Sequence, residues 1–109
     1  MQRGDVIVCT SSGDYGKPRP AVVVQSDLFN ETHDSVTICP FSTHLHEAPL
    51  YRLLIAPNKH NGLKDPSQIM IDKITSVKRD KIRQKIGVLT VDQMNKINDA
   101  LLLWQNLKK

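Results

Sequence analysis

Most of the chain before residue 88 consists of short apolar runs separated by stretches rich in glycine, proline, asparagine and serine. β-Branched residues dominate these runs, and such runs between turn-forming residues predict β-strands. The expected strands cover residues 5–10, 20–25, 35–39, 51–55 and 68–71, the last continuing through 72–73 into 74–77. Ser26 is expected to cap a single helical turn, residues 26–30. Pro40 cannot donate an amide hydrogen to a ladder, so we expect an edge or a bulge there.

A helical periodicity replaces the strand pattern in the last part of the chain. Apolar residues recur at spacings of three and four and form one stripe, made of Met94, Ile97, Leu101 and Trp104. Thr90 and Gln93 match a capping box, in which the threonine hydroxyl accepts from the third amide and the glutamine reaches back. We therefore expect a helix over residues 91–107. Leu102 and Leu103 are surplus to the stripe, which favours a contact with a second copy of the chain or with a protein partner.

Short strands followed by one C-terminal helix indicate an α+β fold that is mainly β, a small twisted barrel or half-barrel with the helix packed on it. Its 109 residues, 39% of them hydrophobic and 24% charged, suffice for a single packed domain over residues 1–109. No apolar run approaches the roughly 20 residues that span a bilayer, and the start lacks a signal peptide, so we expect a cytoplasmic protein. Cys9 and Cys39 each lie inside an apolar run, which predicts buried thiols and neither a disulfide nor a zinc site.

The charge balance favours polyanionic partners, because lysine and arginine total 15 against 11 acidic residues and the net charge is +4. Aromatic residues make up only 5% of the chain, so it lacks the stacking platform of an RRM domain or of a single-strand-binding OB fold. Contact with nucleic acid must then depend on arginine, lysine and hydroxyl groups. The densest basic stretch, residues 78–85, is typical of a solvated strand end and turn, with extension of an RNA-binding face as the alternative.

Two prolines flank the most informative residue, Arg19. Pro18 and Pro20 fix their own φ angles and push Lys17 and Arg19 towards extended backbone. Arg19 is thereby held rigidly where the second apolar run begins. A permanently charged guanidinium with five donors on such a mount suits recognition of a phosphate or of a developing phosphorane. An ordinary surface arginine at a strand start is the alternative.

Four motifs together resemble one protein family. They are Gly4-Asp5-Val6-Ile7, Arg19-Pro20-Ala21-Val22-Val23-Val24-Gln25-Ser26-Asp27, Pro40-Phe41-Ser42-Thr43 and Asp72-Lys73-Ile74-Thr75-Ser76-Val77. In order and spacing, over nearly the whole chain, they resemble the MazF/PemK (Kid) toxins of toxin–antitoxin modules. The resemblance implies a small SH3-like barrel of the CcdB/PemK type with a C-terminal helix. It also implies a homodimeric endoribonuclease that cleaves single-stranded RNA without metal or cofactor, and a cognate antitoxin whose tail occupies the RNA groove.

The same resemblance implies which residues act. Arg19 matches the family's catalytic arginine. The family's catalytic threonine has its best match in Ser42, with Thr43 one residue further on, and both stay candidates. Asp72 and Lys73 stand where the family usually has an Asp-Gln pair, so the aspartate matches and the glutamine does not. The loop before Arg19 is also shorter than the loop common in relatives.

His44 and His46 offer a second set of candidates for the chemistry. They alternate along the chain, so on an extended segment they point the same way, and imidazoles are a natural acid and base for ribonuclease chemistry. Ordinary loop histidines are the alternative, and the family does not rely on histidines here. In total the expected substrate-binding residues are Lys17, His44, His46, Asp72 and Lys73.

A gyrase-poisoning toxin of the CcdB type is the main alternative function. Such toxins share this fold and bind a protein target without hydrolysing RNA, and Trp104 is similar to that family's C-terminal tryptophan. Against it, CcdB-type chains lack the rigid Arg-Pro start of the second strand, and this chain continues beyond Trp104 to Lys109. A catalytically silent interaction module on the same barrel is a third interpretation.

Overall fold

The computed structural model describes residues 1–10 and 17–108 of the chain. Within them the strands are β1 (Asp5–Cys9), β2 (Arg19–Val23), β3 (Ser35–Ser42), β4 (Arg52–Ile55), β5 (Ser67–Met70), β6 (Thr75–Lys78) and β7 (Ile82–Val88). The helices are α1 (Asp27–Asn30), α2 (Val91–Trp104) and the short 3-10 helices η1 (Ile71–Lys73) and η2 (Arg79–Lys81). The loop expected at residues 11–16 lies outside the described residues.

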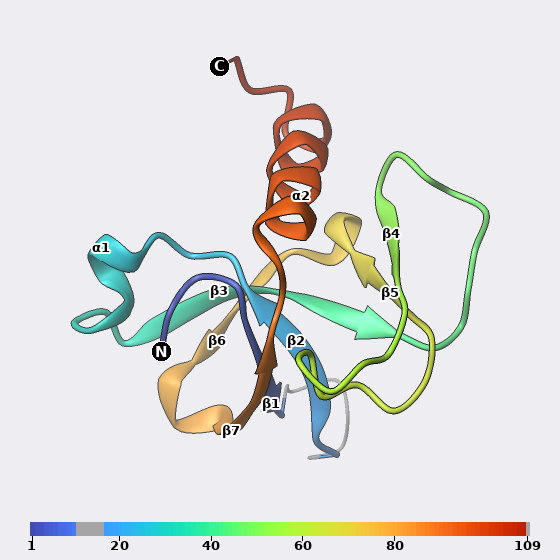
Figure 1. The fold of residues 1–109 in the computed structure, drawn as a ribbon. Coiled ribbons are helices and arrows are strands. Elements are labelled where there is room, and N and C mark those ends of the chain that lie inside the picture. The colour runs from blue at the N-terminus through green and yellow to red at the C-terminus, as the bar shows by residue number, and fades with distance from the viewer. Residues whose placement is uncertain (11–16, 109) are drawn as a thin grey trace.

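The strands form an antiparallel sheet in the order β4-β5-β3-β2-β1-β7, with β6 added on β3. The first half of β3 pairs with β6, its end pairs with β5, and β2 occupies its other edge. Figure 1 shows β3 crossing the molecule, with β4 and β5 near one end, β6 near the other and α2 above the sheet. The structure confirms the predicted class, α+β and mainly β, a small barrel with a C-terminal helix.

Pro40 lies inside β3, so the expectation of an edge or bulge is wrong. The strand continues to Ser42, and Pro40 stands opposite Ala21 of β2. Along the other edge of β3, pairing with β6 extends only to Ile38, and pairing with β5 begins at Phe41. Pro40 therefore occupies the gap between two partner strands, where its missing amide hydrogen removes no ladder hydrogen bond.

Both faces of the central strands are buried, as their continuous apolar runs predict. Successive residues of a strand face opposite sides. Val22 accordingly joins a cluster that packs beneath α2, β4 and β5, while Val23 joins a second cluster that packs against Val77 of β6. Cys39 belongs to the first cluster and Cys9 to the second, so both thiols are buried as predicted, and burial raises the pKa of Cys39 to about 12.

Local capping signals place the starts of both α-helices where the sequence predicts them. Ser26 caps α1 through its hydroxyl. At α2, the hydroxyl of Thr90 accepts from the amide of Gln93 at 3.1 Å, and the Gln93 side chain accepts from the amide of Thr90 at 2.9 Å. Ile97 of the predicted stripe is fully buried, and Met94 packs against the same cluster. None of the helices in the described residues is long and apolar enough to cross a membrane.

The helix α2 ends at Trp104, earlier than the predicted residue 107. Asn106 adopts a left-handed φ of 55°, and the amide of Leu107 donates to the carbonyl of Leu102 at 2.8 Å. Asparagine tolerates this conformation, and the hydrogen bonds are those of a Schellman-type helix end. The last apolar residue of the predicted segment therefore lies past the helix.

The strand β7 is absent from the prediction, which treats residues 78–85 as a strand end and turn. The turn is made by η2, and β7 then begins at Ile82 and pairs with β1 along its length. Two register shifts, which bypass Ile86 and Arg83, interrupt the period-two alternation by which a strand is recognised. Similarly, η1 interrupts the continuous strand expected over residues 68–77.

The loop at residues 57–66 is fixed against β7. Asn61 is fully buried; its side chain accepts from two amides of the loop at 3.1 and 3.0 Å and donates to the carbonyl of Ala56 at 2.9 Å. Gly62 has a φ of +71°, and a Cβ there would lie 2.2 Å from the backbone oxygen of Ile86. The close approach of the loop to β7 therefore requires glycine at this position.

The variant Gly62→Ala should lose roughly 2 kcal/mol of unfolding free energy, because the new Cβ meets backbone and the φ angle is strained. The melting temperature measured by circular dichroism should fall by roughly 10 °C. Lys59→Ala, an exposed substitution in the same loop, should melt close to wild type. Equal melting temperatures for Gly62→Ala and wild type would contradict the tight contact.

Candidate active site

A cavity of about 270 Å³ opens where β2 begins. Its polar wall combines groups from separate elements, namely Arg19 of β2, Ser42 of β3, Lys73 of η1 and Thr75 of β6. Its floor includes Ala21 and Ile38, which belong to the second hydrophobic cluster. The cavity thus surrounds an apolar floor with a guanidinium, an ammonium and two hydroxyl groups.

The register between β2 and β3 brings Arg19 and Ser42 together. Ala21 stands opposite Pro40, so the residue two positions before Ala21 and the residue two positions after Pro40 approach each other. Arg19 is the first residue of β2 and is exposed, whereas Ala21 is buried. The structure therefore has Arg19 at the exposed start of a buried strand, as the flanking prolines predict.

The two candidate hydroxyl groups face different cavities. Ser42 lines the cavity of Arg19, whereas Thr43 lines a neighbouring concavity of about 350 Å³. The Ser42 hydroxyl accepts a hydrogen bond from the amide of His44 at 3.1 Å. It contacts the carbonyl oxygen of the same residue only at 3.4 Å, so its proton is held weakly. Ser42 can therefore donate to a group bound beside Arg19.

Asp72 and Lys73 are adjacent in the chain but face different surroundings. Lys73 lines the cavity of Arg19, while the carboxylate of Asp72 accepts two hydrogen bonds from Arg52 of β4, at 2.7 and 2.9 Å. The side chains of Arg52 and Asp72 are mostly buried, with 11% and 15% of their surface exposed. The hydrogen bonds from Arg52 lower the pKa of Asp72, so its carboxylate stays ionised. Asp72 thus fixes η1 to β4 and Lys73 reaches the cavity.

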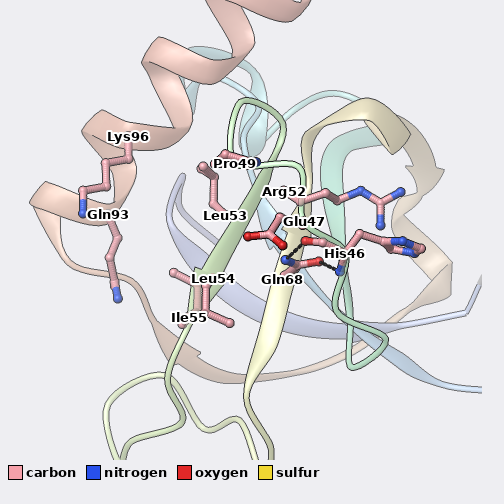
Figure 2. A pocket seen from close by; sticks show the side chains of 10 residues that line it. All are labelled: His46, Glu47, Pro49, Arg52, Leu53, Leu54, Ile55, Gln68, Gln93 and Lys96. Atoms are coloured by element: carbon pink, nitrogen blue, oxygen red, sulfur yellow. Dashed lines mark hydrogen bonds between the residues drawn. The ribbon is translucent and has the colours of Figure 1, made fainter.

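The histidines lie on the chain segment after β3, and neither of them lines this cavity. Their rings pack edge to face, with 4.6 Å between the centroids of His44 and His46. His46 lines a separate concavity of about 400 Å³ between β4 and α2. Figure 2 shows this concavity and the two hydrogen bonds, at 2.8 and 2.7 Å, that join the backbone of His46 to the side chain of Gln68. Lys17, the remaining candidate, is exposed and lines neither cavity.

Two contributors to the site carry no signal in the sequence. Arg52 is 20 positions from Asp72 in the chain, so no spacing rule predicts that it pairs with that carboxylate. Cys9 stands opposite Arg19 in the register of β1 and β2 and lines the same cavity. Only the tertiary structure reveals either relation.

The chain as a whole matches a known protein family. A family model described as PemK-like, MazF-like toxin of type II toxin–antitoxin systems matches residues 2–104. The chain belongs to this family. Membership confirms the resemblance that the Arg-Pro strand and its companion motifs indicate.

Individual relatives cover almost the whole toxin chain. A probable endoribonuclease MazF of Mycolicibacterium smegmatis is 41% identical over 105 residues, which span 95% of each chain. Endoribonuclease EndoA of Bacillus subtilis is 25% identical over 105 residues, 93% of this chain and 90% of the relative. A solved mycobacterial endoribonuclease in complex with its cognate antitoxin has the same fold, with a TM-score of 0.84, 23% identity and coverage of 100% and 98% of the two chains. These relatives do not favour the CcdB-type alternative.

The ion pair of Asp72 and Arg52 should make the stability of this toxin depend on pH. The pKa of Asp72 is lowered in the folded chain, so its contribution is present above the ordinary carboxyl pKa of about 4 and is lost as the pH falls through the lowered value. Asp72→Asn should therefore cost about 2 kcal/mol at pH 7 and much less at pH 2.5, measured by urea unfolding.

Asp80→Asn is the matched control, because Asp80 is exposed in η2. It should leave the unfolding free energy within about 0.5 kcal/mol of wild type at neutral pH. A cost for Asp72→Asn that is the same at pH 2.5 and pH 7 would mean that packing, and not the ion pair, is lost.

Proposed function

We propose that this toxin is an endoribonuclease that cleaves single-stranded RNA without a metal ion, leaving a 2′,3′-cyclic phosphate and a 5′-hydroxyl. The observation that carries the proposal is the cavity that gathers Arg19, Ser42 and Lys73, in a chain whose relatives are named endoribonucleases. Guanidinium, ammonium and hydroxyl groups are the donors that hold a phosphodiester.

The proposed reaction uses the RNA's own 2′-hydroxyl as the nucleophile. The hydroxyl attacks the adjacent phosphorus in line and loses its proton, while the bond to the 5′-oxygen breaks and that oxygen takes up a proton. Arg19 stabilises the charge that develops on the phosphorane, and its planar fork can contact two oxygens at once. The rigid start of β2 supports this role, because a donor that is already in place needs no reorganisation during the reaction.

We assign the assisting hydroxyl to Ser42. Its position in the cavity of Arg19, and its weakly held proton, support a hydrogen bond to a nonbridging oxygen. Thr43 lines the neighbouring concavity, which favours a role in binding. Lys73 and the exposed Lys17 would hold phosphates of the strand on either side of the cut. Proton transfer by histidine is the competing mechanism, since His44 and His46 lie close after Ser42 in the chain.

The proposed partners follow from the charge of the chain and from its relatives. A solved structure of similar fold is bound to its cognate antitoxin, and a cationic RNA site attracts an acidic antitoxin segment. We therefore propose that a cognate antitoxin neutralises this toxin by competing with RNA for the same surface. We place this activity in the cytoplasm, where messenger RNA is the abundant single-stranded substrate.

Wild-type protein should cut a long RNA into discrete fragments in the presence of EDTA, and Arg19→Ala should reduce the rate by roughly a hundred- to a thousandfold. Arg19→Lys should recover little of the loss, because a point charge does not replace a planar fork. Arg83→Ala, which removes an exposed arginine of β7 outside the cavity, is the control and should cut at nearly the wild-type rate.

The same assay separates the two hydroxyl groups and tests the histidines. Ser42→Ala should lose more activity than Thr43→Ala, and His44→Ala and His46→Ala should be milder than either. An Arg19→Ala variant that cuts at the parental rate, with either histidine variant inactive, would refute the arginine mechanism in favour of a histidine acid and base.

We propose that two copies of the chain form a homodimer through the last turn of α2. Leu103 and Trp104 are adjacent large apolar side chains that are 59% and 47% exposed there, and a second copy of the chain could cover them. Light scattering at micromolar concentration should give about twice the chain mass of 12.3 kDa. Leu103→Glu should shift the protein towards the monomer, whereas the mass of one chain for wild type would exclude the dimer.

A further inference from the structure

The concavity that Thr43 lines is a direct neighbour of the proposed cleavage cavity. Pro20 lines both of them. Ser42 and Thr43 are consecutive residues, and one faces each side. A strand of RNA whose phosphate lies beside Arg19 would therefore bring its next nucleotide to the neighbouring concavity.

The volume and lining of this neighbouring concavity suit one unstacked ring. Its volume is about 350 Å³. Apolar side chains come from three parts of the chain, including Val8 of β1, Leu63 of the 57–66 loop and Ile86 of β7, and Pro18 and Pro20 add their rings. A mostly apolar hollow with a few placed polar groups is the usual form of a site for a small ring system.

The polar groups at its rim can read the edge of a base. Thr43 supplies a hydroxyl, Lys64 an ammonium and Gln84 a carboxamide. All three residues are exposed, and within the part of the chain that the structure describes no hydrogen bond or ion pair engages their side chains. A carboxamide carries a donor and an acceptor side by side, which allows a two-point contact with one base edge.

The rim is held in place before any ligand arrives. Lys64 lies two residues after Gly62, whose backbone is in close contact with Ile86. The amide of Val88 donates to the carbonyl of His60 at 2.8 Å. Gln84 lies on β7 opposite Val8 in the register with β1. Fixed positions on two sides of the hollow are what selective recognition of a base requires.

We infer that this concavity, the base subsite, takes one nucleobase next to the scissile phosphate, and that Gln84 with Lys64 determines which base is preferred there. The inference rests on the proposed ribonuclease function. Sequence-specific recognition of RNA acts mostly on unstacked single-stranded bases, which present their edges to side chains. Asp65 also lines the concavity beside Lys64, so the rim carries no net positive charge and its selectivity rests on hydrogen-bonding groups.

The test uses a panel of short RNA oligonucleotides that carry one cleavage site and every base in turn at each flanking position. For each oligonucleotide kcat/KM is measured with wild type, Gln84→Ala, Lys64→Ala and the control Lys59→Ala. Gln84→Ala should reduce the discrimination among bases roughly tenfold at one flanking position and leave the other positions as in wild type. Gln84→Glu, which replaces the amide donors by acceptors, should change which base is preferred. Lys59→Ala should keep the wild-type preferences.

A second readout does not depend on cleavage. The same oligonucleotides are bound to Arg19→Ala protein, with and without Gln84→Ala, and affinities are measured by fluorescence anisotropy. The base subsite predicts that affinity depends on the base at one position and that Gln84→Ala removes this dependence. Circular dichroism verifies that the variants are folded, which the exposed position of Gln84 on an edge strand favours.

The outcomes separate this inference from the function on which it rests. If wild type cuts RNA and both Gln84→Ala and Gln84→Glu keep every base preference, the base subsite is overturned and the proposed ribonuclease function stands. Wild type that cuts no RNA overturns the proposed function, and the binding measurement then decides the subsite alone. If the affinity for RNA does not depend on the base, and Gln84→Ala weakens only the binding of an acidic antitoxin peptide, the concavity binds a protein partner and the inference is overturned.

Discussion

The strand β3 pairs with three other strands, and the geometry of the site depends on the register of these pairings. It exchanges β6 for β5 along one edge while β2 stays paired along the other. The exchange falls at Pro40, the residue that has no amide hydrogen to contribute. The register that places Pro40 opposite Ala21 also brings Ser42 beside Arg19. A slip of one residue would turn Ser42 to the opposite face of the sheet and away from the guanidinium.

The charged side chains of η1 also contribute to the site. Arg52 binds the carboxylate of Asp72 through both of its oxygens, so that carboxylate does not neutralise the cations of the neighbouring cavity. Lys73 is left with Arg19 on the cavity wall. An anion that enters the cavity therefore meets two positive groups above an apolar floor, where the lower local polarity strengthens their attraction.

The two cavities that Pro20 lines serve different parts of the proposed function, namely cleavage and base preference. The cavity of Arg19 offers groups that act on any phosphodiester, whereas the neighbouring concavity offers an amide, an ammonium and an apolar floor that distinguish one ring from another. Rate and sequence preference would then respond to different substitutions. The glycine contact between the 57–66 loop and β7 matters for the second property, because it fixes the rim from which the base would be read.

Local sequence determined the features whose causes lie within a few residues. The capping box of Thr90 and Gln93, the buried apolar strands and the rigid position of Arg19 between two prolines depend only on nearby backbone, and the structure has all three. The four motifs, among them the one around Arg19, were together sufficient to indicate the family. Tertiary structure alone decided the strand β7, the place of Pro40 inside β3, the pairing of Arg52 with Asp72 and the separation of Ser42 from Thr43. Each of these depends on which distant segments lie side by side, and pairing energies between distant strands leave no periodic trace in one chain.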